Sequence, residues 1–293
     1  MKGIRDIKRR IKAVKNTGQI TKAMQLVAAA KMKQAQQRTL AHRPYALLFH
    51  QVVSCLGNRI DKLVHPLLEA RPVKKRGILC ISSDKGLCGP LNTNLARAIQ
   101  AIPKDSAHFI CAGDKALQAL SRIQYSVLAD FKVADKLSFH AIKTIAEYML
   151  QLYMDGTIDT IEVLYPSFIN TLIQETLTEK LAPIDDLAVS LEGLRKTYKL
   201  KLKDTQSDNR RFEFEPTSAL LLEEIPLLFI KQKIYHAFLE ARAAEHSARM
   251  VAMKTATDNA KKLIQSLNLE YNKARQAMIT QEILEIASSS LAP

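Results

Sequence analysis

The sequence has no tryptophan, and none of its 9 glycines falls between Ile225 and Leu291. Its 4 cysteines, Cys55, Cys80, Cys88 and Cys111, form no CxxC pair, which is typical of free thiols in a reducing, intracellular compartment. No apolar run reaches the roughly 18 residues that a membrane-spanning helix needs, and no signal-peptide core stands at the start. These absences argue against a disulfide scaffold, a transmembrane protein and a secreted protein.

Motifs for metal binding are also missing. The 7 histidines are scattered along the chain without HxxxH or HExxH spacing. Because a metal centre needs several ligands brought together at defined spacings, we expect no metal site.

The glycine-free stretch at the end of the chain has the pattern of a long helix packed against another helix. Small and apolar residues recur there at alternating spacings of four and three: Ile230, Ile234, Ala237, Ala241, Ala244, Ala248, Val251 and Thr255. This repeat is typical of a coiled coil. A helix of about 60 residues would be about 90 Å long, which exceeds the width of one small domain. We therefore expect something to be wrapped around this helix or moved by it.

The start of the chain offers a partner helix. Ile4, Ile7, Ile11, Val14, Gly18 and Thr21 share one register, and the stripe is then expected to shift to Ile20, Ala23, Met24 and Val27. A second apolar face is expected at Tyr45, Leu48, Phe49, Val52, Val53 and Leu56. One helix with a local kink at Pro44 is the simplest interpretation. The pattern predicts an antiparallel coiled coil of the two termini with other structure inserted; two ordinary helices of a compact bundle are the alternative.

The net charge of +14 is concentrated near the start of the chain. Residues 1–43 hold twelve Lys or Arg and a single acid, Asp6. Nucleic acid, anionic lipid and an acidic protein surface could all meet such a helix. The segment has no aromatic residue before Tyr45 for base stacking, and its apolar face before Val27 has no large anchor except Leu26. An acidic protein partner fits best, and a basic coiled-coil protein that binds nucleic acid or a membrane surface is the rival hypothesis.

Between about Arg76 and Pro183 short apolar runs alternate with helical segments. Strands are predicted at 77–82, 108–112, 125–128, 160–165 and 171–181, and helices at 95–102, 113–120 and 136–154, with Asn92 or Thr93 as a helix cap. This alternation predicts an inserted Rossmann-like α/β domain, mainly parallel with an antiparallel edge. The expected organisation is a shaft helix over 1–57, a linker over 58–75, the α/β domain over 76–182, an exposed loop or ribbon over 183–216 and a second shaft helix over 217–293.

One turn of this domain stands where α/β folds bind nucleotide phosphates, between a strand and a helix. It consists of Asp84, Lys85, Gly86, Leu87, Cys88 and Gly89. The turn contains neither GxGxxG nor GxxxxGK[ST], Pro90 removes an amide that could face a phosphate, and Cys88 has no histidine nearby in sequence to act as its base. We therefore expect a structural turn with no cofactor and no catalytic residue; an enzyme with a nucleotide at this turn ranks third.

Three stretches carry a resemblance to a known family. They are Asn16–Met24, Val27–Met32 and Arg43–Tyr45 near the start; Asp84–Gly89 with Leu91 and Asn92 in the middle; and Glu245, Ala248–Lys254, Ala256–Ala260, Tyr271–Gln276 and Ile279–Glu282 near the end. In this order they resemble the gamma subunit of F-type ATP synthases over nearly the whole chain. Pro90 stands where the family usually has a second glycine, and the cysteine-bearing insertion of the chloroplast forms is missing.

The resemblance implies a central rotor shaft that couples ion flow through the membrane sector to ATP synthesis on the beta subunits. It implies a hexamer of alpha and beta subunits, an epsilon subunit and a membrane ring of c subunits as partners, one copy of the chain per complex, and no nucleic acid or membrane insertion. Met24, Lys22, Lys31, Lys33, Arg249, Arg275, Gln276 and Thr280 would contact partners. The chain itself would not be catalytic, and it would lie on the cytoplasmic face of a bacterial inner membrane.

Overall fold

The computed structural model describes residues 3–56, 65–135, 137–184 and 218–290; at 43, 46–47, 50–56, 218–222 and 287–290 only the backbone is described. The chain divides into two units. The coiled-coil unit comprises Met1–Ala30 and Arg249–Pro293, and the α/β unit comprises Lys31–Ala248. Two long helices, α1 (Ile4–Leu56) and α6 (Ser218–Ser290), each contribute residues to both units.

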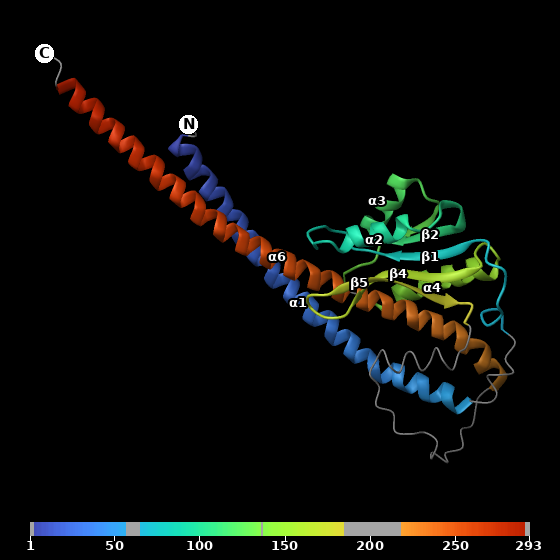
Figure 1. Ribbon diagram of the computed structural model, residues 1–293. Helices are drawn as coiled ribbons and strands as arrows, with labels where there is room; N and C mark the ends of the chain where they lie inside the picture. Colours follow the sequence, from blue (N-terminus) through green and yellow to red (C-terminus); the bar gives the residue numbers. More distant parts are fainter. Residues whose placement is uncertain (1–2, 57–64, 136, 185–217, 291–293) are drawn as a thin grey trace. The chain divides into compact units, whose positions relative to one another are not determined.

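The α/β unit is built on a five-stranded sheet with the order β3-β2-β1-β4-β5. The strands are β1 (Arg76–Ile81), β2 (Ala107–Ala112), β3 (Val127–Phe131), β4 (Thr160–Phe168) and β5 (Gln174–Ala182). Neighbouring strands are parallel except at the edge, where β5 pairs antiparallel with β4. The connecting helices are α2 (Leu91–Gln100), the short η2 (Lys104–Ser106), α3 (Asp114–Ile123) and α4 (Phe139–Met154). Figure 1 shows α2 and α3 on one face of the sheet and α4 on the other.

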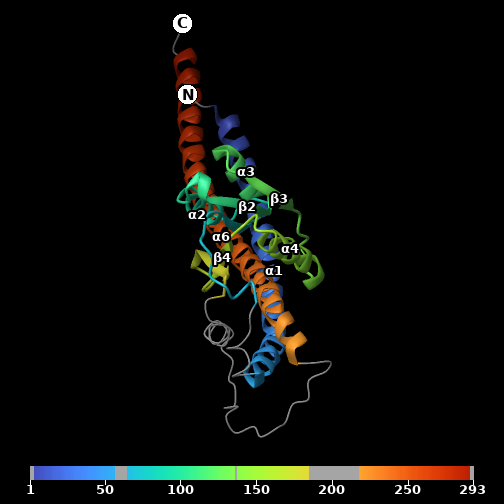
Figure 2. The same ribbon diagram turned by 90° about the vertical axis from the view of Figure 1, so that its right-hand side faces the viewer.

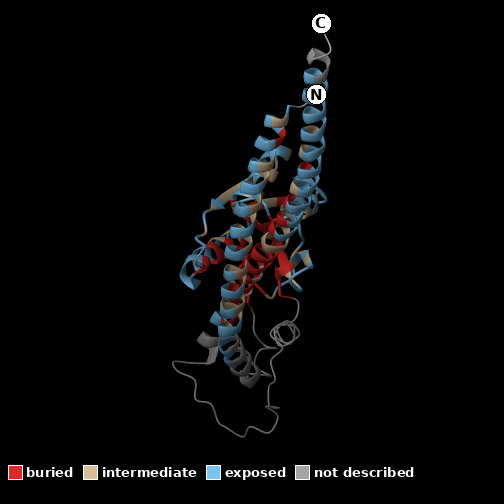
Figure 3. Ribbon diagram, turned by 90° about the vertical axis from the view of Figure 1, so that its left-hand side faces the viewer, coloured by how far each residue is buried: buried red, intermediate tan, exposed pale blue. Residues whose placement is uncertain are grey.

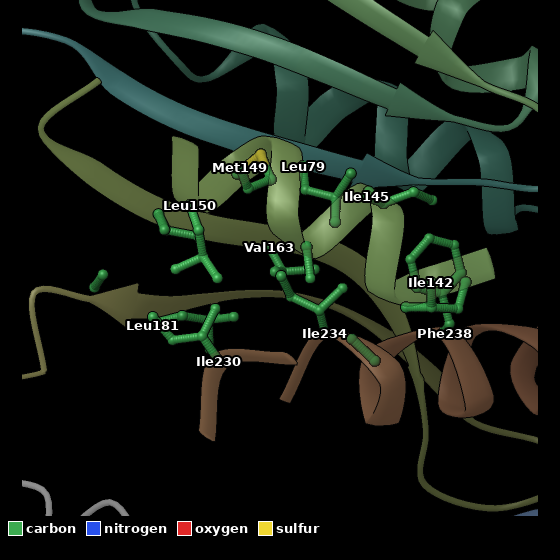
Figure 4. Packing of buried hydrophobic residues seen from close by; sticks show 14 of the residues in the cluster. Leu79, Ile142, Ile145, Met149, Leu150, Val163, Leu181, Ile230, Ile234 and Phe238 are labelled. Carbon is green, nitrogen blue, oxygen red and sulfur yellow. The ribbon is translucent and has the colours of Figure 1, made fainter. Parts of the chain in front are cut away.

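Side chains that alternate along the strands divide the core of the α/β unit into two layers. Ile78, Cys80 and Leu164 face α2 and α3, whereas Leu79, Ile81 and Val163 face α4 and the part of α6 that precedes Ala248. Figure 4 shows Ile230, Ile234 and Phe238 of α6 beside Leu181 of β5 and Ile142 of α4. Figure 3 shows how the buried residues concentrate in this unit. Helix α6 is therefore an integral part of the domain core.

The predicted mainly parallel sheet with an antiparallel edge is confirmed, with changes at several ends. Helix α2 begins at Leu91, four residues before the predicted start, and Pro90 stands at its N-cap without a side-chain cap. The predicted caps are wrong, because the Asn92 side chain bonds to Ser83 and Cys88 instead. Strand β3 begins at Val127, two residues after the predicted start at Tyr125. The Tyr125 amide still donates to the Leu120 carbonyl of α3, and its ring packs against Phe109. The predicted loop or ribbon lies largely in 185–217, outside the described residues.

In the coiled-coil unit, segment 4–30 of α1 lies antiparallel beside α6, which continues beyond the end of α1 (Figures 1 and 2). Thr21 and Thr257 hydroxyls are 2.8 Å apart, and a Cβ added at Gly18 would lie 3.3 Å from Cβ of Ala260. Buried and half-buried positions alternate by four and three in α6, at 253, 257, 260, 264, 267, 271 and 274. The matching positions in α1 are 4, 7, 11, 14, 18, 21, 25 and 28. The predicted coiled coil is therefore present.

Parts of the predicted seam are wrong. Ile20 is 60% exposed and Val27 is 58% exposed, because the first register of α1 continues past Thr21 to Ala28 without a shift. Thr255 is exposed, and the seam runs through Met253 and Thr257 instead. Tyr45 and Leu48 are exposed, Phe49 packs against the larger core, and the side chains of Val52, Val53 and Leu56 lie outside the described residues.

The first six of the eight residues in the predicted α6 stripe pack against the α/β domain. Ile230, Ile234, Ala237 and Ala241 belong to the core shared with the sheet and α4, and Ala244 and Ala248 pack against Cys88 and Leu91. A stripe of small apolar residues has the same spacing whether it meets a helix or a sheet, so the pattern alone could not distinguish these partners.

Candidate functional site at the junction of α6 with the sheet

The carboxyl ends of the parallel strands form the place where a fold of this kind holds its ligands. Here the strand order reverses between β1 and β4, which makes this edge the usual crevice for a nucleotide. Helix α6 fills it: Phe238, Ala241, Arg242 and Glu245 lie against the ends of β1, β2 and β4. The cavity that is left measures about 10 Å³, room for about one water molecule. The crevice is therefore occupied by the protein's own helix.

The turn from Asp84 to Gly89 is held together by its own polar groups. Ser83 Oγ bonds to Oδ1 of Asn92 at 2.9 Å, and Nδ2 of Asn92 donates to Cys88 Sγ at 3.2 Å. Leu87 and Gly89 both adopt positive φ angles, 64° and 60°. Cys88 is 1% exposed and packs on Ala244 and Ala248 of α6. Its thiol is thus a packing group with satisfied polar neighbours, which agrees with the expected structural turn.

A second turn packs closely against the same strand end. Gly113, at φ 115°, is the N-cap residue just before α3, and a Cβ at this position would lie 2.4 Å from the carbonyl oxygen of Ser82. The Ser82 hydroxyl accepts a hydrogen bond from the Ala116 amide at 2.8 Å. The first amides of α3 that could face a phosphate are thus directed at the chain itself.

Arg242 is the buried cation of the junction. Its guanidinium donates to the Glu245 carboxylate at 2.8 Å and to the carbonyl oxygen of Val133 at 2.9 Å, and it lies 3.8 Å from Asp84. Only 9% of the Arg242 side chain and 8% of the Glu245 side chain are exposed. One side chain of α6 therefore contacts both the β1–α2 turn and the segment after β3.

A larger cavity of about 260 Å³ adjoins this arginine. It is lined by α1, α6 and the segment before α4, through Lys31, Gln34, Ala35, Arg38, Asp135, Leu137, Leu239, Arg242 and His246. Lys31 Nζ donates to Asp135 at 2.6 Å, and this bond lowers the pKa of the Asp135 carboxyl. Lys31, predicted as a partner contact, thus already has a partner within the α/β unit.

The other predicted contact residues lie on the coiled-coil helices. Lys22, Lys33, Arg275, Gln276 and Thr280 are exposed, and Met24 and Arg249 are half-buried. The Thr280 hydroxyl donates to the Gln276 carbonyl one turn earlier, at 2.9 Å, and Lys22 Nζ donates to Gln25 at 3.4 Å. Each of these hydrogen bonds stays within a single helix.

Sequence reasoning missed Arg242 and Val133. Arg242 could have been noticed because it stands among small seam residues, three positions before Glu245. A charged side chain at a buried position needs a partner, and this spacing supplies one. Its contact with the Val133 carbonyl spans 109 positions in the sequence, and no local pattern encodes such a pairing.

Two features of the described part of the chain bear on alternative sites. Within the described ranges, no three or more His, Cys, Asp or Glu side chains are placed to hold a metal ion. Over the same ranges, none of the helices has the length and apolarity required to cross a membrane.

Fold and site together define a class of protein: two long terminal helices form a coiled coil, and an inserted α/β domain has its ligand crevice filled by one of them. Comparison with known proteins identifies the family within this class.

A family profile described as ATP synthase matches residues 3–292. The ATP synthase gamma chain of Opitutus terrae is 46% identical over 100% of this chain and 99% of its own length. The ATP synthase gamma chain of Methylacidiphilum infernorum is 45% identical over 98% of each.

Solved structures share the fold. A chain of the Euglena gracilis mitochondrial ATP synthase, solved as OSCP/F1/c-ring in rotational state 3, aligns with a TM-score of 0.67 and 22% identity over 98% of this chain and 93% of that chain. A chain of its rotor in rotational state 1 aligns with a TM-score of 0.62 and 21% identity, over 94% and 98%. The chain belongs to the ATP synthase gamma-chain family.

Proposed function

We propose that this chain is the shaft that couples ion flow through a membrane ring of c subunits to ATP synthesis on the beta subunits. One copy would stand inside a hexamer of alternating alpha and beta subunits. An asymmetric shaft contacts the three beta subunits differently at any instant. The shaft can therefore shift the conformational equilibrium of a beta subunit only through contacts that differ in strength between that subunit's conformations.

The exposed end of α6 is the observation that carries this proposal. The coiled-coil seam in α6 extends to Ala274, and Met278, Ile283, Leu284 and Ile286 beyond it are between 47% and 69% exposed. Such a run of large apolar side chains is unfavourable in water and is typical of a surface that another protein covers. A partner that encloses the end of the shaft accounts for it.

The basic surface of α1 supports the proposal that the partner surface facing it is acidic. Asp6 is the single acidic residue within 4–33. Eight basic side chains are exposed there: Arg5, Lys8, Arg9, Arg10, Lys12, Lys15, Lys22 and Lys33. Acidic loops of the beta subunits would suit this surface. Met24, Lys22, Lys33, Arg249, Arg275, Gln276 and Thr280 remain our proposed contacts with the hexamer.

The α/β unit would serve as the base of the rotor. It would bind the epsilon subunit and dock on the c ring at the cytoplasmic face of a bacterial inner membrane. Because α6 fills the crevice in which a nucleotide would bind, we infer that the chain is not catalytic by itself. Nucleotide chemistry would take place on beta.

Co-purification tests this function most directly. The tagged chain, expressed with its own alpha and beta subunits, should elute as one complex with a single copy of the chain, and that complex should hydrolyse ATP. The isolated chain should hydrolyse none. A chain that elutes alone under these conditions, or that hydrolyses ATP alone, would contradict the proposal.

A further inference from the structure

In the proposed rotor, torque has to pass between the sheet and helix α6 without the two slipping. Most of their contact is apolar, through residues such as Ile230, Ile234 and Phe238. Apolar burial is non-directional, so it opposes separation strongly but opposes a small slide or rotation of the helix much less. Directional polar contacts are therefore needed to hold the helix in one position on the sheet.

Lys231, Lys233 and Arg242 are among the side chains of α6 that form ion pairs with other elements of the α/β unit. Lys231 pairs with Glu147 of α4, whose side chain is 48% exposed, and Lys233 pairs with Glu179 of β5, whose side chain is 35% exposed. Because these carboxylates are partly open to water, solvent screens both pairs, although the lysine side chains themselves are only 14% and 12% exposed. The third residue, Arg242, is itself only 9% exposed; its ion-pair partner Asp84 is 38% exposed, and what sets Arg242 apart is its added hydrogen bond to the carbonyl oxygen of Val133.

The partners of Arg242 come from both sides of the strand edge. Val133 follows β3 at one end of the sheet order, and Asp84 follows β1 near its centre. Glu245, one turn further along α6, binds the other nitrogen of the guanidinium and so orients the fork. A planar cation that is oriented by Glu245 of its own helix and held by Val133 and Asp84 of the domain resists both sliding and rotation of the helix, which a flexible ammonium group cannot do equally well.

We propose that Arg242 is the positioning residue that fixes α6 to the α/β domain, so that rotation of the domain turns the shaft without slip. The crevice that binds ligands in related folds would thus serve as the socket of a mechanical joint. This inference rests on the proposed function, because a joint matters only in a rotor.

Ion pumping by inverted membrane vesicles that carry the whole complex tests this joint. The variants are Arg242→Leu, which removes all three contacts, Arg242→Lys, which keeps the charge, and Lys231→Leu, the matched control on the same helix. For each, ATP hydrolysis, ions pumped and the amount of assembled complex are measured together. The ratio of ions pumped to ATP hydrolysed is the readout, because a merely structural role would lower both rates in proportion to lost complex.

We expect Arg242→Leu to lower this ratio about fivefold, the lower end of the range typical of an energetic coupling. Arg242→Lys should recover part of the loss, and Lys231→Leu should match the wild type. An assembled Arg242→Leu complex with the wild-type ratio would overturn the proposal. If Arg242→Leu does not assemble, Arg242→Lys decides: a ratio below that of Lys231→Leu supports the joint, and an equal ratio overturns it.

The wild-type vesicles separate this result from a failure of the proposed function. If they pump no ions while the complex is present, the rotor assignment itself is wrong. If they pump normally and the Arg242 variants do too, only the role of Arg242 is wrong.

Discussion

Single residues at the junction show how reactive groups become structural when their surroundings are complete. Cys88 is buried between α6 and its own turn, with Asn92 donating to its sulfur. His236 is buried as well, 3.5 Å from Glu240, and burial lowers its pKa to about 3. Both residue types often take part in catalysis, but here each is enclosed by the shaft helix and the domain.

Cys88→Ser should leave the turnover of the assembled complex nearly unchanged. The serine hydroxyl can accept the same bond from Asn92, but it loses apolar packing against Ala244 and Ala248, so we expect stability to fall by about 1 kcal/mol. Thermal melting of the isolated chain and ATPase activity of the complex measure the two effects. A large loss of turnover with assembly intact would mean that the turn takes part in chemistry.

His236 should make the α/β unit sensitive to acid. Its folded pKa is about 3 against 6.5 in an open chain, so the unfolded state binds the proton more tightly. Stability is therefore complete above about pH 6.5 and is lost as the pH falls towards 3, by at most about 1.4 kcal/mol per pH unit.

His236→Gln should flatten this part of the pH dependence, as measured by urea unfolding of the isolated chain at a series of pH values. Burial raises the pKa of Glu240, so that carboxyl contributes with the opposite sign. Because Glu240 is present in both proteins, the difference between them isolates the histidine. Parallel curves for the two proteins would show that His236 does not control acid stability.

At the scale of elements, close approach of the two long helices is the feature that matters. Small residues on both sides of the seam bring the backbones together, as at Gly18 and Ala260. Helix pairs that approach in this way have no space for added side-chain volume.

Gly18→Val should therefore force the helices of the coiled-coil unit apart. A Cβ alone would already lie 3.3 Å from that of Ala260, and two further methyl groups would overpack the seam by about 1–3 kcal/mol. Ala23→Val, at an exposed position of the same helix, is the control for a valine outside the seam; because valine is a better helix former than glycine, helix propensity would not explain a loss in Gly18→Val. Circular dichroism melting should rank Gly18→Val well below Ala23→Val; equal melting temperatures would show that the seam tolerates the volume.

At the scale of the whole molecule, the proposed shaft acts by unequal contacts with its surroundings. A substitution there can change coupling without changing the fold, provided that the side chain faces outwards. Met24 is half-buried at the edge of the seam, so a longer polar side chain at this position can reach water.

Met24→Lys should weaken coupling more than it weakens folding. The added cation would form a charge-assisted contact with a surrounding subunit in some rotary positions and not in others. Ions pumped per ATP hydrolysed should fall, whereas the melting temperature of the isolated chain should change little. Normal pumping per ATP in this variant would argue against a contact at Met24.

The sequence by itself determined the kinds of elements and their order. The spacing of Ile4, Ile7 and Ile11 predicted a packed helix, and the apolar runs that became β1 and β2 predicted buried strands, because both periods are local properties of the chain. It also determined that the Asp84–Gly89 turn lacks a nucleotide motif, since such motifs depend on residues that are close in sequence.

Only the tertiary structure decided what each face packs against. Ile230 and Ile234 had the spacing of a coiled-coil seam, yet they face a sheet, because a helical stripe specifies a buried face and not its partner. The role of Arg242 depended on Val133 and Asp84, which the chain brings to it only on folding. Hydrogen bonds between distant segments are set by how the elements pack, and packing is a property of the whole fold.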